Sequence, residues 1–182
     1  MQTKTKKMAV SAMLAALYFA LSMLAIPVGG LKLTFEHLPI IIAALMFGPV
    51  DALVIGALGE LANQMMTYGF TVTTVLWMAP AMFRGLSMGL CAKFLSKYVG
   101  VNAVIEKKLP LAFWVTCVIS GLICSLLNTF TLYVDSKMFG YYSYAMVFGV
   151  LWIRLAASAV SSVVMAVAAK PVLAAMRKAK IV

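Results

Sequence analysis

The chain has 182 residues, of which 64% are hydrophobic and only 11% are charged, and its mean hydropathy is +1.04. A soluble domain carries about 25% charged residues, so this composition excludes an ordinary soluble domain and predicts an integral membrane protein. The net charge of +10 gathers at the ends of apolar segments, which is typical of cytoplasmic anchors and argues against binding of nucleic acid.

Six apolar segments account for most of the chain and predict an all-α, polytopic membrane protein, a single six-transmembrane-helix bundle over residues 1–182. The first segment ends before Pro27 and the Gly29-Gly30 pair, and the second is short for a membrane crossing. The third begins after Gly48-Pro49, and the fourth contains both Pro80 and Arg84. The predicted spans are about 8–26, 37–47, 50–67, 74–95, 109–134 and 144–169.

The basic residues predict the orientation of the bundle. Cytoplasmic loops of membrane proteins carry an excess of Lys and Arg. With a cytoplasmic N-terminus, the outer loops hold only Lys32 and Lys137, and both termini lie in the cytoplasm. The inner segments then hold Lys4, Lys6, Lys7, Lys93, Lys97, Lys107, Lys108, Lys170, Arg177, Lys178 and Lys180.

The first span carries small residues at a spacing of four, namely Ala12, Ala16 and Ala20. Such stripes allow two helices to approach closely in lipid. Packing within the same bundle would explain the stripe by itself. Because this span contributes no polar group to the outer half, however, we expect its small face to be free for another protein.

The third span carries four polar residues at i, i+3, i+4 and i+7, which share one stripe of a helix: Glu60, Asn63, Gln64 and Thr67. Polar residues that face lipid are expensive, so this stripe is expected to face the interior of the bundle. Arg84, Arg154, Asn128 and Trp77 fall at similar depths on other spans, and the loop over residues 28–36 adds Lys32 and Glu36. Together they predict a ligand cavity that opens to the outside and is closed toward the cytoplasm.

The charges in this layer indicate the ligand. Arg84 and Arg154 against Glu60 leave one unpaired positive charge, which a carboxylate or phosphate would satisfy. The alternative is a buried Glu-Arg pair that fixes helix packing, with the second arginine reaching outward. His37 is more typical of an interface residue than of a ligand contact. The cysteines 91, 117 and 124 are interpreted as small core residues, and no metal site is expected.

Motifs for other functions are missing from the sequence. It has no Gly-rich loop ending in Lys-Ser or Lys-Thr, no His-Glu-x-x-His and no Gly-x-Ser-x-Gly. A membrane enzyme would have only Glu60 and His37 as an acid/base pair, and a non-enzymatic scaffold remains a further alternative. We therefore expect a non-enzymatic subunit that binds a solute but does not drive its transport alone.

Two stretches carry a family resemblance: SAMLAALYFALSML and LKLTFEHLPIIIAALMFGPVDALVIGALGELANQM. They resemble the S components, the substrate-binding membrane subunits of energy-coupling factor (ECF) vitamin transporters in bacterial cell membranes. The resemblance implies partners, namely a transmembrane T component and two cytoplasmic ATPases that hydrolyse ATP, so that this chain needs no cofactor. It also implies that Ala12, Ala16 and Ala20 dock the T component and that the loop with Lys32 and Glu36 is a lid over the vitamin.

The stretch NQMMTYGFTVTTVLWMAPAMFRGL is most similar to members assigned to pantothenate. Pantothenate carries one carboxylate, which matches the single surplus positive charge. Folate-type members are the alternative, although an arginine would be expected where this chain has Lys32. Riboflavin and thiamine lack a carboxylate and would leave an arginine unpaired.

Overall fold

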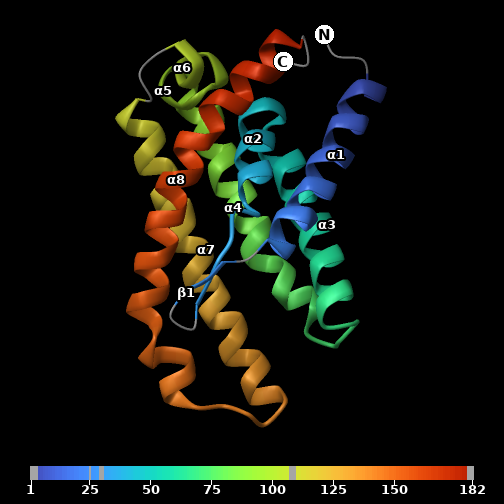
Figure 1. Cartoon of the computed structure of the whole chain (residues 1–182), viewed down its shortest axis with the longest axis vertical. Helices are drawn as coiled ribbons and strands as arrows, with labels where there is room; N and C mark the ends of the chain where they lie inside the picture. Colours follow the sequence, from blue (N-terminus) through green and yellow to red (C-terminus); the bar gives the residue numbers. More distant parts are fainter. Residues whose placement is uncertain (1–3, 25, 29–30, 107–109, 180–182) are drawn as a thin grey trace.

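A computed structural model describes residues 4–24, 26–28, 31–106 and 110–179 (Figure 1). The described chain forms a helical bundle with one short hairpin, which confirms the predicted all-α membrane fold. Its elements are α1 (Lys4–Met23), β1 (Ile26–Val28), β2 (Leu31–Leu33), α2 (Leu38–Phe47), α3 (Pro49–Thr67), α4 (Thr74–Phe94), α5 (Ser96–Val99), α6 (Val101–Glu106), α7 (Leu111–Met138), the π-helix η1 (Ala145–Gly149) and α8 (Leu151–Lys178).

The helices differ in how they relate to a membrane. α1, α4, α7 and the continuous η1–α8 segment are long and apolar enough to cross one. α2 has only 10 residues, which extend about 15 Å at 1.5 Å per residue, roughly half of a hydrocarbon core. Its residues 39–45 are all buried, and it contacts α1, α3, α4 and α8. The short second segment is therefore the central helix of the bundle.

The first predicted span is too long at its C-terminal end. α1 ends at Met23, and Ile26–Val28 instead forms β1, which pairs antiparallel with Leu31–Leu33. Apolar β-branched residues suit a strand as well as a membrane helix, so hydropathy alone does not distinguish the two. Gly29 and Gly30, where the sequence predicted a break, lie outside the described residues.

Two further boundaries differ from the prediction. α7 continues to Met138, beyond the predicted end at residue 134, because Asp135 is buried and accepts hydrogen bonds from other elements. The polar linker over residues 96–108 contains the short helices α5 and α6. α4 accommodates Pro80 without a break, as predicted.

α3 and α4 pack closely because glycines remove side chains from their interface. A Cβ atom on Gly85 would lie 2.6 Å from the carbonyl oxygen of Ala52, and one on Gly56 would lie 2.9 Å from that of Ala81. Such contact is typical of small residues between membrane helices. It brings the polar stripe of α3 close to the helix that carries Arg84.

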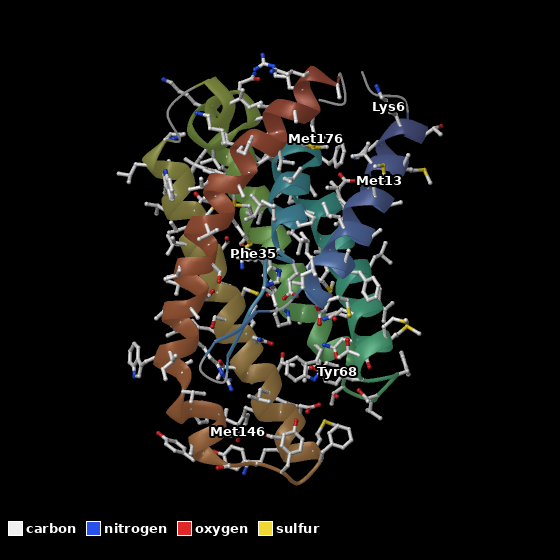
Figure 2. All side chains as sticks on the ribbon, viewed as in Figure 1. Lys6, Met13, Phe35, Tyr68, Met146 and Met176 are labelled. Atoms are coloured by element: carbon white, nitrogen blue, oxygen red, sulfur yellow. The ribbon has the colours of Figure 1, made fainter. Side chains whose placement is uncertain are left out.

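The two ends of the bundle are unlike each other. The start of α1, the end of α8 and the helices α5 and α6 lie at one end, with the loop over residues 139–143 at the other (Figure 1). Figure 2 shows Lys6 and Met176 at the first end, Met146 at the second and Phe35 near mid-height. Lys97, Arg177 and Lys178 belong to the elements of the first end. The predicted inner residues Lys107, Lys108 and Lys180 lie outside the described residues.

Candidate ligand site

Glu60 is the centre of one buried polar cluster. Its Oε1 accepts a hydrogen bond from Gln64 Nε2 at 2.7 Å, and its Oε2 accepts one from Tyr18 Oη at 2.8 Å. Asn63 Nδ2 lies 3.4 Å from both carboxylate oxygens, and Thr67 Oγ1 donates to Asn63 Oδ1 at 3.3 Å. All four residues of the predicted stripe are thus linked, with Glu60 and Gln64 buried and Thr67 exposed.

α1 contributes to this cluster, contrary to the expectation that the first span carries no polar group here. Tyr18 is fully buried and donates to Glu60, while Ser22 Oγ lies 3.0 Å from Asn63 Oδ1. Tyr18 packs where Gly59 has no side chain, since a Cβ there would lie 2.6 Å from the tyrosine ring. Tyr18 and Ser22 are four residues apart and therefore share the inward face of α1 with Val10 and Leu14.

Arg84 is the centre of a second cluster. It is 2% exposed, and its Nη2 donates to Ser162 Oγ on α8 at 3.0 Å. The guanidinium also interacts with the thiol of Cys124 on α7, whose Sγ lies 3.7 Å from His37 Nε2. Within the described ranges, no carboxylate forms an ion pair with Arg84. The alternative of a buried Glu-Arg pair is therefore not formed between Glu60 and Arg84, because Glu60 takes its hydrogen bonds from neutral groups.

The second cluster is incompletely satisfied. Arg84 Nε and His37 Nδ1 are buried and have no hydrogen-bond partner. A buried polar group without a partner costs about 1–3 kcal/mol, and more when it is charged. Native proteins contain few such groups, and each calls for an explanation. The two clusters thus differ in kind, because Glu60 is satisfied by the protein and Arg84 is not.

Trp77 belongs to a third cluster, at the end of the bundle that holds the loop over residues 139–143. Its Nε1 donates to Asp135 Oδ1 at 3.3 Å, and the same carboxylate accepts hydrogen bonds from Thr73 and Tyr141. Partial burial and the hydrogen bond to Asp135 raise the pKa of Tyr141 to about 12. This cluster ties the start of α4 to the end of α7 and to the loop that follows it.

Asn128 and Arg154 lie apart from the hydrogen bonds of the Glu60 and Arg84 clusters. Asn128 is exposed, although it lies between the buried Cys124 and Thr131 on one face of α7. The side chain of Asn128 is therefore accessible at the surface of the isolated subunit. Arg154 is half-buried and donates to the carbonyl oxygen of Met146 at 3.0 Å, so it links the start of α8 to η1.

The residues expected to form a lid and a docking face are placed as follows. The backbone of Lys32 lies in β2, and its side chain lies outside the described residues. Glu36 Oε1 lies 3.7 Å from His37 Nε2. Ala12, Ala16 and Ala20 are all exposed, and α1 turns Val10, Leu14 and Tyr18 inward instead. The alanine stripe is therefore not used for packing inside this bundle.

Sequence reasoning missed several members of the two inner clusters. Tyr18, Cys124 and Ser162 were absent from the predicted site, and His37 was interpreted as an interface residue. The four-residue spacing of Ser158 and Ser162 marks one face of α8 that meets Gly121, whose carbonyl oxygen accepts a hydrogen bond from Ser158. Cys117 and Cys124 are buried free thiols, and the described residues contain no cluster of His, Cys, Asp and Glu suited to a metal ion.

Comparison with known proteins gives two positive findings. The family model described as "ECF transporter, substrate-specific component" matches residues 6–173. The solved structure reported as "Structure and mechanism of the S component of a bacterial ECF transporter" superposes with a TM-score of 0.51 at 16% sequence identity, over 97% of this chain and 95% of that one. No curated protein sequence matches. At this identity the solved structure shows a shared fold.

Proposed function

Because the chain belongs to the family of ECF transporter substrate-specific components, we propose that it is the binding subunit for a small, anionic, water-soluble vitamin, with pantothenate as the first candidate. Members of this family are transport subunits and not enzymes, and they act in general with T and ATPase components. The ligand, the residues that bind it and the details of the assembly are our proposal.

One observation carries the proposal of an anionic ligand. Arg84 is 2% exposed and has no ion-pair partner in the described chain, and its Nε has no hydrogen-bond partner. Buried charges are stable in proteins when they are paired and hydrogen-bonded. A carboxylate on the ligand would supply both the charge and the acceptor, and charge-assisted bonds of this kind are about twice as strong as neutral ones.

The proposed binding site combines the predicted residues around this arginine. Hydroxyl and amide groups of pantothenate would meet the polar side chains of α3 and α7, while its carboxylate would meet Arg84. Folate, with two carboxylates, would leave one without a buried arginine unless Arg154 moved inward from its bond to Met146. The proposed contacts are Glu60, Asn63, Gln64, Thr67, Trp77, Arg84, Asn128 and Arg154, with Lys32 and Glu36 in the lid.

Binding is tested by calorimetry on the purified protein without ATP. The panel contains pantothenate, folate, biotin, riboflavin and thiamine, together with pantothenol, in which an alcohol replaces the carboxylate. We expect submicromolar binding of pantothenate and at least about tenfold weaker binding of pantothenol. Equal binding of the two would contradict the role of the carboxylate, and no binding of any vitamin would contradict the proposed function.

We further propose that the exposed stripe of Ala12, Ala16 and Ala20 docks the T component, whose partner ATPases hydrolyse ATP. Its exposure in the isolated subunit supports this, because close helix contact needs small residues on a free face. Ala16→Trp should abolish uptake by the assembled transporter and leave vitamin binding unchanged, with Met13→Trp as the matched exposed control. Uptake that survives Ala16→Trp would contradict the docking role.

The orientation of the subunit is proposed from the two ends of the bundle. Both α1 and α8 place their basic terminal turns at the same end (Figure 1), and basic residues favour the cytoplasmic side. We therefore propose cytoplasmic termini and a ligand site that is loaded from outside. Labelling of single cysteines at positions 6 and 139 from either side of sealed vesicles tests this orientation.

A further inference from the structure

His37 lies at the meeting point of the hairpin and the central helix. It is the residue before α2 begins at Leu38, and three residues separate it from the end of β2. Its ring contacts that of Tyr18, with the centroids 5.7 Å apart. The side chain is therefore held by α1 on one side and approaches α7 at Cys124 on the other.

His37 and Arg84 approach the same thiol from different elements. His37 Nε2 lies 3.7 Å from Cys124 Sγ, and the guanidinium of Arg84 interacts with that thiol as well. Each residue keeps one buried nitrogen without a partner, namely Nδ1 of His37 and Nε of Arg84. Arg84 Nε can only donate a hydrogen bond, and an imidazole nitrogen can donate one when it is protonated.

We propose that Arg84 Nε and His37 Nδ1 together form the subsite for the carboxylate of the ligand. This inference rests on the proposed function and specifies where in the site the anionic group binds. A carboxylate has two oxygens with about four acceptor positions, so it can accept a hydrogen bond from each residue at once. His37 thereby becomes a specificity-determining residue.

The surroundings favour this subsite over one at Glu60. The Glu60 oxygens already accept hydrogen bonds from Tyr18 and Gln64 and lie near Asn63, and a carboxylate ligand would be repelled by that group. The groups that face His37 are Glu36, the ring of Tyr18, Cys124 and Arg84. Glu36 lies beside Nε2 and would repel an anion from that side of the ring, which leaves Nδ1 as the nitrogen for a ligand carboxylate. Arg84 is always cationic and attracts the anion.

The test uses a ligand fragment, so that it does not depend on the identity of the vitamin. The purified full-length protein in detergent is unfolded by heat, with tryptophan fluorescence as the signal, in sodium acetate, in sodium chloride of equal ionic strength, or in chloride with acetamide. Acetamide is the neutral counterpart of acetate. With a Kd on the order of 10 mM, 100 mM acetate should raise the midpoint by about 3 °C over chloride. Acetamide should not raise it.

Four variants test which residues produce the rise of the unfolding midpoint in acetate. His37→Gln and Arg84→Gln should each reduce the acetate shift to below about 1 °C, while Arg177→Gln, in the last turn of α8, should retain it. His37→Asn should retain at least half of the acetate shift, because the side-chain amide of Asn reaches the position of Nδ1. The longer amide of Gln reaches the position of Nε2 instead. The midpoint in chloride alone shows whether each variant is folded.

The outcomes separate this inference from the proposed function. An absent acetate shift in the unsubstituted protein, or a full shift in His37→Gln, would overturn the subsite. Equal behaviour of His37→Asn and His37→Gln would overturn the assignment to Nδ1. An acetate shift that depends on both His37 and Arg84, combined with no binding of any vitamin in the panel, would support the subsite and reject the proposed function.

Discussion

The two buried charged residues on the facing helices α3 and α4 are in opposite situations. Glu60 is surrounded by donors from its own helix and from α1, at distances between 2.7 and 3.4 Å. Arg84 has one hydroxyl partner on α8 and one thiol neighbour on α7, and its Nε has no partner. Burial is nearly the same for both, at 8% and 2% exposure, so the difference lies in their hydrogen bonds.

This difference indicates a division of roles. A satisfied buried network holds its elements in one arrangement, and here it fixes α1 against α3. A buried cation without an ion-pair partner carries a desolvation cost that is not compensated. A bound anion would compensate this cost, so the site is suited to bind one. We therefore expect substitutions near Glu60 to change stability first and substitutions near Arg84 to change ligand affinity first.

The largest expected effect follows from removal of the arginine. Arg84→Gln should lower the affinity for the vitamin identified in the panel by about 30-fold or more, since loss of one member of a buried charge pair costs about 2–5 kcal/mol. Thermal stability should change little or increase, because an unpaired buried charge is removed. Calorimetric titration and thermal unfolding of the same preparation measure both quantities.

The comparison for this prediction is Arg154→Gln, which removes a second proposed contact, whose guanidinium donates to the carbonyl oxygen of Met146 in η1. It should reduce affinity by less than about threefold if the Arg84 cluster alone holds the anion. Comparable losses in both variants would show that the two arginines act together. The contrast between Arg84 and Glu60 would then not account for binding.

The second prediction concerns the packing of the Glu60 cluster. In Gly59→Ala the added methyl group would lie 2.6 Å from the Tyr18 ring, and overpacking of this kind costs about 1–3 kcal/mol. The unfolding midpoint should fall by about 2–12 °C for a chain of this length. Gly149→Ala is the matched control, since its Cβ would meet the nearest atom at 3.7 Å. If Gly59→Ala is as stable as this control, α1 can move away from α3 without a loss of stability, which would contradict the prediction.

The sequence was sufficient to predict the helical bundle and the polar stripe of α3. The hydrocarbon core of the membrane sets the length and apolar composition of a span. Polar residues at a four-residue spacing on such a span are expected to face the interior of the bundle. The exposed alanine stripe was predicted for the same reason. These features depend on local periodicity, which can be recognised in a single chain.

The partners of Glu60 and Arg84 could not be predicted, because they depend on how helices far apart in sequence pack. Tyr18 is 42 residues from Glu60, and Ser162 is 78 residues from Arg84. Opposite charges at similar depth suggested an ion pair, yet the rotation of α3 turns Glu60 toward α1. The hairpin was missed because Ile26 is equally compatible with an apolar helix and residues 28–36 were assigned to a loop.

The third prediction measures the link between α1 and Glu60. Tyr18→Phe keeps the ring on Gly59 but removes the hydroxyl that donates to Glu60 at 2.8 Å, which should cost about 1–2 kcal/mol. In a double-mutant cycle with Glu60→Gln, we expect a coupling energy of about 1 kcal/mol. Vitamin affinity should fall by less than about threefold, since the Glu60 cluster positions helices and does not hold the anion. Additive effects on stability would contradict the direct bond.

The smallest expected effect concerns the hydroxyl that positions Arg84. Ser162→Ala removes the acceptor of the Arg84 Nη2 bond at 3.0 Å and leaves the charge and the Nε donor in place. The guanidinium then keeps its attraction for an anion but is held less firmly, so affinity should fall by about three- to fivefold, or roughly 1 kcal/mol. Ser158→Ala is the matched control on the same face of α8, because its hydroxyl donates to the carbonyl of Gly121, and it should leave affinity unchanged. A loss in Ser162→Ala as large as in Arg84→Gln would mean that this hydroxyl binds the ligand itself, and the unsatisfied Nε of Arg84 would no longer be the feature that distinguishes the two clusters.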